Sequence, residues 1–255
     1  MPGYGFMVVG VTGGRPFTHN RCLEYEWKLA NSHGGVGSLY VNVASPKWGE
    51  PASMNGPAGA CAPNELPCQA YNHSANNIED AIAYARSVGA NAPMWWIDVE
   101  VLNRWSPNTA LNALTVKAAK ETLEKHGIRP GVYSTWLQWR KITGDAVFGM
   151  PVWAAGVPTD AEMPGYCNRP EKAFNGGEIW MVQSIPIVFD VNYVCDPMVP
   201  HVGSSFAFPQ PATPAAPAVE AGPAEQASET AKQAARGKQS TKDRGKDKKP
   251  AKPGK

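Results

Sequence analysis

The sequence predicts an α/β fold, specifically a (β/α) TIM-like barrel with a strand-only C-terminal end. Two observations predict it. Apolar segments alternate with amphipathic helical segments through residues 1–155, which is typical of parallel β-α-β units. Beyond residue 155 apolar segments follow one another with no clear helix between them. The end of the domain is therefore expected to consist of strands.

Short apolar segments rich in β-branched and aromatic residues predict the strands. They are expected at 5–12, 36–44, 94–101, 129–135, 151–155, 178–185 and 187–194. Helices are expected at 20–32, 77–88, 109–126 and in a short segment that ends near 142. Asn76 or Asn77 is the expected cap of the second helix. Residues 45–75 are expected to be a long loop that a disulfide stabilises.

Composition divides the chain into a barrel domain at 1–205 and a tail at 206–255. The tail consists mainly of Pro, Ala, Lys, Gln, Ser and Glu, so it offers too little apolar surface to fold and should be disordered. It holds ten Lys/Arg and five Asp/Glu, a formal charge of +5, whereas the whole chain carries +2. Such a tail is either a solvated segment or a weak binder of an anionic cell-surface polymer.

Four of the five cysteines lie in or beside irregular segments, which favours disulfides. The expected pairs are Cys61–Cys68 and Cys167–Cys195, with Cys22 left over. Disulfides indicate an extracellular or cell-wall-associated protein, although no signal peptide is visible in this sequence. No apolar run is long enough to span a membrane. Neither a zinc motif nor a phosphate-binding loop is present, so no metal or cofactor is expected. Separately, we expect a monomer.

Asp98 and Glu100 stand two residues apart at the end of the apolar segment 94–101. Side chains at this spacing on a strand point to the same side, with Cα atoms about 6.6 Å apart. The C-terminal ends of barrel strands form the catalytic face. Two carboxyl groups so close cannot both ionise freely, which leaves the acid and the carboxylate that glycoside cleavage requires. The alternative is a structural pairing with Arg104 or Lys117.

Further candidates lie near the ends of other predicted strands. Asp190 is a third acid, whose alternative role is to bond loop amides. Aromatic faces stack on sugar rings and polar side chains bind hydroxyl groups, so residues of these kinds near strand ends are candidates for substrate binding. These residues are Tyr40, Tyr133, Trp153 and Gln183.

Five segments carry a resemblance to a known family. They are WWIDVE at 95–100, GVYST at 131–135, PVWAA at 151–155, IWMVQS at 179–184 and FDVNYV at 189–194. In this order they resemble the glycoside hydrolase family 25 lysozymes, and more closely an actinobacterial exported group with that barrel. The resemblance implies that Glu100 is the general acid, that Asp98 is the stabiliser or nucleophile, and that Asp190 supports them. It also implies a peptidoglycan substrate, cut between N-acetylmuramic acid and N-acetylglucosamine.

One departure from that family concerns the first strand, which normally ends in Gly-x-Asp. Here Thr12 replaces the Asp, and Asn42 stands near a position where lysine is common. Asn42 is therefore a further candidate for substrate binding, in a partly rebuilt cleft. Three functions remain open: a retaining glycosidase, a barrel that binds cell-wall carbohydrate without cleaving it, and a scaffold whose basic tail binds the partner.

Overall fold

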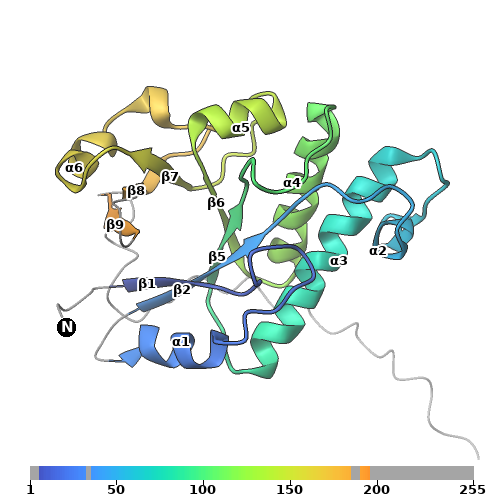
Figure 1. Cartoon of the computed structure of the whole chain (residues 1–255), viewed down its shortest axis with the longest axis horizontal. Helices are drawn as coiled ribbons and strands as arrows, with labels where there is room; N and C mark the ends of the chain where they lie inside the picture. Colours follow the sequence, from blue (N-terminus) through green and yellow to red (C-terminus); the bar gives the residue numbers. More distant parts are fainter. Residues whose placement is uncertain (1–5, 33–35, 185–189, 196–255) are drawn as a thin grey trace, which may run out of the picture. The chain divides into compact units, whose positions relative to one another are not determined.

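The computed structural model describes residues 6–32, 36–184 and 190–195, which form a mixed α/β unit around a curled, mostly parallel sheet (Figure 1). The seven strands of this sheet pair in the order β1-β2-β5-β6-β7-β8-β9, and only β8 and β9 pair antiparallel. The strands are β1 (Phe6–Gly10), β2 (Val36–Asn42), β5 (Met94–Asp98), β6 (Arg129–Ser134), β7 (Val152–Val157), β8 (Ile179–Ser184) and β9 (Val191–Val194).

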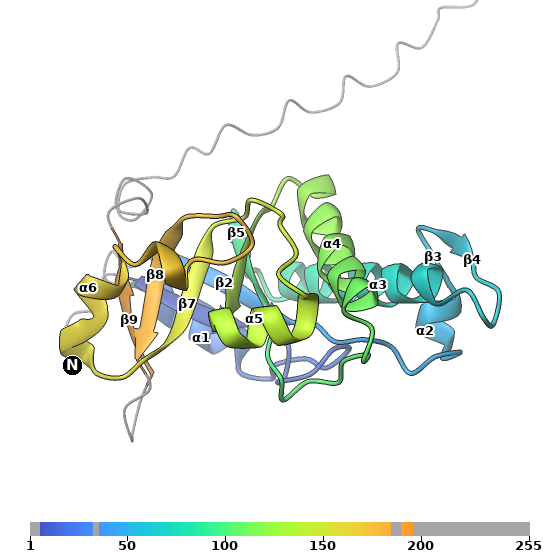
Figure 2. The ribbon, with the colours of Figure 1, turned by 90° about the horizontal axis from the view of Figure 1, so that it is seen from above.

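Helices cover one face of the sheet, and α3 and α4 lie side by side there (Figures 1 and 2). A short hairpin, β3 (Asn55–Gly56) and β4 (Gly59–Ala60), stands apart from the main sheet. The helices are α1 (Leu23–Ala30), α2 (Pro51–Met54), α3 (Leu66–Ser87), α4 (Thr109–Lys125), α5 (Trp136–Thr143) and α6 (Met163–Tyr166), with 3₁₀ turns η2 (Asp160–Glu162) and η3 (Pro170–Lys172).

Each predicted strand has a counterpart in the main sheet, but a closed barrel is not shown. In the described residues the edge strands β1 and β9 are not paired with each other. The sheet nevertheless curls, so that Val8 of β1 and Val194 of β9 pack against one common cluster on its inner face. This inner cluster consists of Met94, Trp96, Trp153, Trp180 and Met181. Between β7 and β8 the chain forms α6 and two 3₁₀ turns, which the expected strand-only ending did not include. The β8–β9 hairpin then ends the described fold.

Strand β5 shows how the two faces of the sheet are filled. Side chains alternate along a strand, so Trp95 and Ile97 join the core under the helices, whereas Trp96 joins the inner cluster. Gly131 on β6 leaves room for Trp96, since a Cβ there would lie 2.5 Å from the Trp96 ring. Asp98 follows Trp96 on the inner side. The alternation therefore carries an acidic group to the end of an otherwise apolar inner face.

The predicted long loop at 45–75 is wrong. It contains α2, the β3–β4 hairpin and the first turns of α3, which begins at Leu66. Apolar periodicity missed these turns because most of the side chains they bury are polar or small. Gln69 Nε2 donates to the carbonyl oxygens of Ala62 and Pro63 at 3.1 and 3.0 Å, and Asn72 Nδ2 donates to that of Gly59 at 2.9 Å. Asn76 and Asn77 consequently lie inside α3 and do not cap it.

The structure contains both disulfides that the sequence predicts, Cys61–Cys68 and Cys167–Cys195, and Cys22 is exposed and free. Cys68 lies in the first turn of α3, and its bond ties the hairpin segment to that helix. The second bond joins the end of α6 to the residue that follows β9. It therefore holds the last hairpin of the sheet against the segment that precedes it.

Removing the second disulfide should destabilise the fold more than removing the first. The bonds span sequence separations of 28 and 7 residues. Loop-closure entropy then gives about 3.6 kcal/mol for Cys167–Cys195 and about 2.4 kcal/mol for Cys61–Cys68. The double variants Cys167→Ser/Cys195→Ser and Cys61→Ser/Cys68→Ser should be compared by urea unfolding. Equal losses, or a larger loss for the shorter loop, would contradict this ranking.

The predicted tail, 206–255, and the predicted domain boundary at 205 lie outside the described residues. Within the described part, no helix has the length and apolar character needed to cross a membrane.

Candidate functional site

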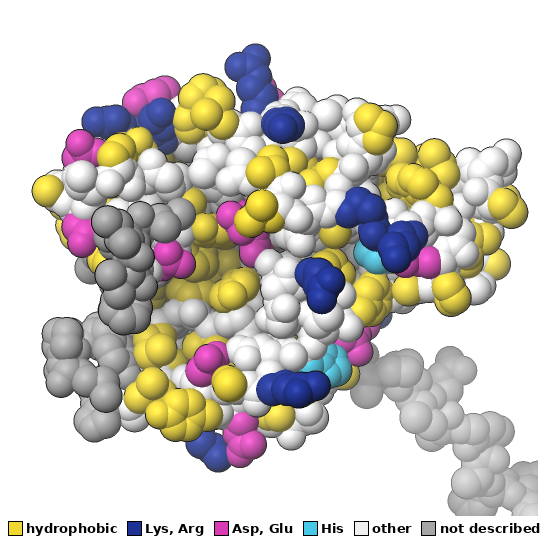
Figure 3. Space-filling view, in the orientation of Figure 1, with side chains coloured by type: hydrophobic (Ala, Val, Ile, Leu, Met, Phe, Trp, Pro, Cys, Tyr) yellow, Lys and Arg dark blue, Asp and Glu magenta, His cyan; other side chains and the backbone are white. Residues whose placement is uncertain are grey.

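The candidate site lies where parallel strands end together. Asn42, Asp98 and Tyr133 are aligned across β2, β5 and β6, and Tyr133 is aligned with Trp153 of β7. Gln183 of β8 is aligned with Ala155, two residues further along β7. The register therefore places predicted residues of five strands side by side, although Trp153 is the second residue of β7 and does not lie near its C-terminal end as expected. Figure 3 shows a hollow with a largely hydrophobic floor and acidic side chains near its rim, over the region between β9 and β5 in Figure 1.

A chain of hydrogen bonds joins β1, β2 and β5 at this edge. Thr12 Oγ1 donates to Asn42 Oδ1 at 2.6 Å, and the Asn42 backbone N–H donates to Thr12 Oγ1 at 3.1 Å. Asn42 Nδ2 then donates to Asp98 Oδ2. All three side chains are buried. Thr12 and Asn42, the two departures from the resembled family, thus act together to orient Asp98.

Burial governs the protonation of Asp98. Its side chain is 4 % exposed, and Oδ1 has no hydrogen-bond partner in the described residues. Burial raises the pKa of Asp98 well above its ordinary value, and the nearby Glu100 carboxyl raises it further. The surroundings of Asp98 therefore oppose its ionisation.

Glu100 is half-buried and lies in the turn after β5, which ends at Asp98 and not at the predicted residue 101. Burial raises the pKa of Glu100, and the charge of Asp190 adds to this, whereas a hydrogen bond from the Gln138 side chain opposes it. As the general acid that the resemblance implies, Glu100 is expected to be the carboxyl with the raised pKa. Both are raised, and Asp98 is the more strongly affected because it is the more deeply buried.

The basic residues proposed as structural partners of the acid pair bind elsewhere. Arg104 donates from Nε and Nη2 to the carbonyl oxygen of Ser45 at 3.0 and 2.8 Å. Lys117 Nζ lies 3.3 Å from Glu121 on the same helix. In the part of the chain that the structure describes, neither one pairs with Asp98 or Glu100. The structural alternative for the acid pair is therefore wrong for both cations.

Asp190 is exposed and directly precedes β9. Its charge raises the pKa of Glu100 and of Tyr133, which places it near both.

Aromatic side chains form the wall between β6 and β9. Tyr133 Oη donates to Gln183 Oε1 at 2.7 Å, and the Tyr133 ring meets that of Trp153 edge-on at 4.5 Å between centroids. Trp153 Nε1 donates to Asn192 Oδ1 at 3.0 Å. Burial, followed by the charge of the neighbouring acids, raises the pKa of Tyr133, so its hydroxyl group stays protonated.

Tyr40 closes the opposite side of the inner face. A Cβ on Gly10 would lie 2.7 Å from its ring, so the glycine lets Tyr40 pack flat against β1. Burial, and then the charge of Asp98, raises the pKa of Tyr40. The hydroxyl groups of both tyrosines therefore remain neutral hydrogen-bond donors beside the acids.

Gln138 is a residue that the sequence did not predict. Its Oε1 accepts a hydrogen bond from the Val101 backbone N–H at 2.6 Å, and its amide bonds the Glu100 side chain. The Trp105 indole also donates to the Glu100 carbonyl oxygen at 2.7 Å. The only signal in the sequence was a polar side chain in the first turn of a helix that follows a β-strand.

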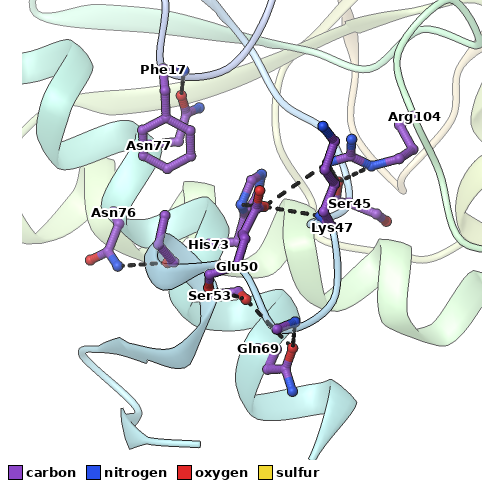
Figure 4. Close-up of polar contacts among 12 residues, drawn as sticks. Phe17, Ser45, Lys47, Glu50, Ser53, Gln69, His73, Asn76, Asn77 and Arg104 are labelled. Carbon is purple, nitrogen blue, oxygen red and sulfur yellow. Dashed lines mark hydrogen bonds and ion pairs between the residues drawn. The ribbon is translucent and has the colours of Figure 1, made fainter. Parts of the chain in front are cut away.

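Side chains of helix α3 bond the loops that follow β1 and β2 (Figure 4). Asn77 accepts a hydrogen bond from the Phe17 backbone N–H at 2.8 Å and donates to the Asn42 carbonyl oxygen at 3.0 Å. His73 Nδ1 lies 2.8 Å from Glu50 Oε1, and its ring meets the Phe17 ring edge-on at 5.1 Å. The loops after β1 and β2 are thus attached to one buried patch of α3.

The protein should lose stability in mild acid because His73 is buried. Burial lowers the pKa of His73 from 6.5 to about 4, and Arg104 adds to this, while Glu50 opposes it. The unfolded chain therefore binds a proton between these values that the folded protein does not. The free energy of unfolding should fall by up to about 1.4 kcal/mol per pH unit as the pH drops through this window.

Denaturant unfolding at several pH values should show this slope, and His73→Gln should make it shallower. His19, which is exposed and pairs with Asp80, supplies the control variant His19→Gln. An unchanged slope in His73→Gln would contradict the assignment.

Comparisons with known proteins point to lysozymes. Residues 66–164 match the family described as lysozyme-like protein 1, a segment that includes Asp98, Glu100 and Tyr133. The chain is 29% identical over 92 residues to a probable GH family 25 lysozyme 2 from Dictyostelium discoideum, covering 35% of this chain and 43% of that protein. It is 29% identical over 89 residues to counting factor 45-1 of the same organism, covering 34% of this chain and 30% of that protein.

The matches therefore span less than half of either relative. No solved structure matches the chain. The matched segment, which contains Asp98 and Glu100, is similar to lysozyme-like proteins at low identity.

Proposed function

We propose that the protein is a retaining glycoside hydrolase that cleaves the glycan of peptidoglycan between N-acetylmuramic acid and N-acetylglucosamine. The observation that carries the proposal is the Asp98–Glu100 pair. Both carboxyl groups have a raised pKa at the C-terminal edge of a parallel sheet, inside the segment that matches a lysozyme-like family. Glycoside cleavage requires one protonated acid beside one carboxylate.

Glu100 is the proposed general acid. It is half-buried, so it is desolvated enough to hold a proton and open enough to meet a substrate. Asp190 favours that proton because its negative charge opposes ionisation of Glu100. The proton passes to the glycosidic oxygen as the bond to the leaving sugar breaks.

Asp98 is the proposed stabiliser or nucleophile. It has to be ionised when positive charge develops at the sugar ring. The amide of Asn42 favours the ionised form by donating to Oδ2, and the positive charge of the transition state favours it further. Tyr40, Tyr133, Trp153 and Gln183 are proposed to bind the sugar rings, with Asn42 positioned to reach them only if it gives up a bond to Thr12 or Asp98.

The second candidate function is a barrel that binds cell-wall carbohydrate and does not cleave it. Thr12 favours it, because a neutral hydroxyl group stands where the resembled family has a carboxylate. Purified protein should be incubated with purified peptidoglycan, and both the bound protein and the released fragments should be measured, the latter by mass spectrometry. Fragments with new reducing ends support the hydrolase. Binding without release supports the second candidate.

Thr12→Asp tests the departure directly. We expect it to raise the rate of fragment release, because it adds a negative charge beside the cationic transition state. Thr12→Ser should leave the rate unchanged, because it keeps the hydroxyl group that bonds Asn42. A rate that falls in Thr12→Asp would show that the bond from Thr12 to Asn42 matters more than the missing charge.

The proposed site of action is extracellular or at the cell wall, which the two disulfides support. The binding of an anionic surface polymer by the basic tail, the monomeric state and the likeness to an actinobacterial exported group remain predictions.

A further inference from the structure

A pocket at the first turn of α5 is lined by aromatic residues and a lysine, unlike the acidic site at Asp98 and Glu100. It has a volume of about 300 Å³ and lies between the start of α5, the end of β7 and the segment of α6 and η3. Its lining includes Trp136, Tyr166, Lys172 and the small residues Ala155 and Gly156. The small residues leave space next to the backbone of β7. The pocket is therefore open to a branch or chain end of a bound polymer and is not part of the hydrophobic core.

Two cations lie over the aromatic residues of this pocket, and one of them, Lys172, lines it. Lys172 Nζ lies 5.0 Å from the centroid of the Trp136 ring and 5.9 Å from that of Tyr166. The guanidinium carbon of Arg169 lies 4.6 Å from the centroid of Tyr166. Within the described residues, neither Lys172 nor Arg169 forms an ion pair with an acidic side chain. The pocket therefore offers positive charge that the fold itself does not neutralise.

We propose that this pocket binds the acidic peptide branch of the glycan substrate, with Lys172 pairing with a branch carboxylate. The proposal rests on the proposed function and extends it to the part of the substrate that is not a sugar. The apolar walls suit short alkyl side chains such as those of alanine, and the half-buried lysine suits a carboxylate. A neutral glycan strand would leave that charge unmatched.

The first turn of α5 connects this pocket to the catalytic candidates. Trp136 and Leu137 line the pocket, and Gln138, the next residue, bonds Glu100 and the Val101 backbone. On the sheet side, Ala155 of the pocket is aligned with Gln183, which accepts the hydrogen bond of Tyr133. A glycan held at the acid pair therefore passes next to the pocket, so a branch on one of its sugars can enter it.

The test compares two polymers and two matched variants. Intact peptidoglycan is compared with the same material after an amidase has removed its peptide branches, and the Kd of each is measured by co-sedimentation. Lys172→Gln removes the charge from the pocket. Lys141→Gln is the control, because Lys141 is exposed in the last turn of α5, away from the pocket. Thermal unfolding followed by circular dichroism checks that both variants are folded.

We expect the wild-type protein and Lys141→Gln to bind intact peptidoglycan about tenfold more tightly than the stripped glycan, as one charge-assisted contact allows. Lys172→Gln should bind both polymers with the affinity of the stripped glycan. Equal wild-type affinity for the two polymers, or an undiminished preference in Lys172→Gln, would overturn the proposal. A wild type that cleaves stripped and intact glycan equally well overturns the branch pocket and leaves the hydrolase intact. Failure to bind either polymer overturns both.

Discussion

Replacing Glu100 with Gln is expected to lower the rate of peptidoglycan cleavage by about 10² or more, as the loss of a general acid does. The substitution keeps the size of the side chain and its ability to bond Gln138 but removes the proton that the leaving oxygen requires. Burial and the charge of Asp190 raise the pKa of Glu100. The wild-type rate should therefore fall as the pH rises through the pKa of Glu100, because the acid loses its proton. The variant should lack this decline.

Glu178→Gln is the matched control. Glu178 is exposed and directly precedes β8, at the opposite end of the parallel strands from Asp98. This variant should cleave at the wild-type rate and show the wild-type pH dependence. If Glu100→Gln cleaves peptidoglycan as fast as Glu178→Gln, then Glu100 is not the general acid.

Replacing Asp98 with Asn should reduce cleavage by a similarly large factor and at the same time stabilise the fold at pH 7. The rate should fall because the neutral amide cannot stabilise or trap the positively charged sugar. The stability should rise because the variant no longer buries an ionisable carboxyl group. The new side-chain oxygen can still accept the hydrogen bond from Asn42 Nδ2.

The gain in folding stability of Asp98→Asn over the wild-type protein should depend on pH. The pKa of Asp98 is higher in the folded protein than in the unfolded chain, so the folded state binds the extra proton at intermediate pH. Ionisation of Asp98 therefore weakens folding as the pH rises from the unfolded pKa toward the folded one. Melting temperatures at pH 4 and pH 7 should thus favour Asp98→Asn only at the higher pH. A variant that melts below the wild-type protein at pH 7 would show that the carboxylate stabilises the fold.

Much of the fold could be predicted because the main sheet is built from apolar segments. Each strand of the main sheet packs side chains into or against one of two hydrophobic clusters, and this packing produces a clear apolar pattern in the sequence. The acids stood out for the same reason, since Asp98 ends a segment in which Met94 to Ile97 are all buried. Where the pattern is apolar, sequence reasoning and structure agree.

The first half of α3 could not be predicted, because Gln69, Asn72 and His73 are buried against backbone and polar partners and so break the apolar pattern. The contact of Gln138 with Glu100 was also hidden, since it depends on how α5 packs beside the turn after β5. The unequal burial of Asp98 and Glu100 follows from where β5 ends, a boundary that apolar patterning places only to within a few residues.

The most direct test of the central claim, that Glu100 protonates the glycosidic oxygen, is the dependence of Glu100→Gln on the leaving group. The ratio of wild-type to variant kcat/KM should be measured on peptidoglycan and on a chito-oligosaccharide aryl glycoside whose dinitrophenolate leaves without protonation. We predict a ratio of about 10² or more on peptidoglycan and a ratio near one on the aryl glycoside. Equal ratios on both substrates would contradict the account, because they would mean that Glu100 shapes the site and does not donate the proton.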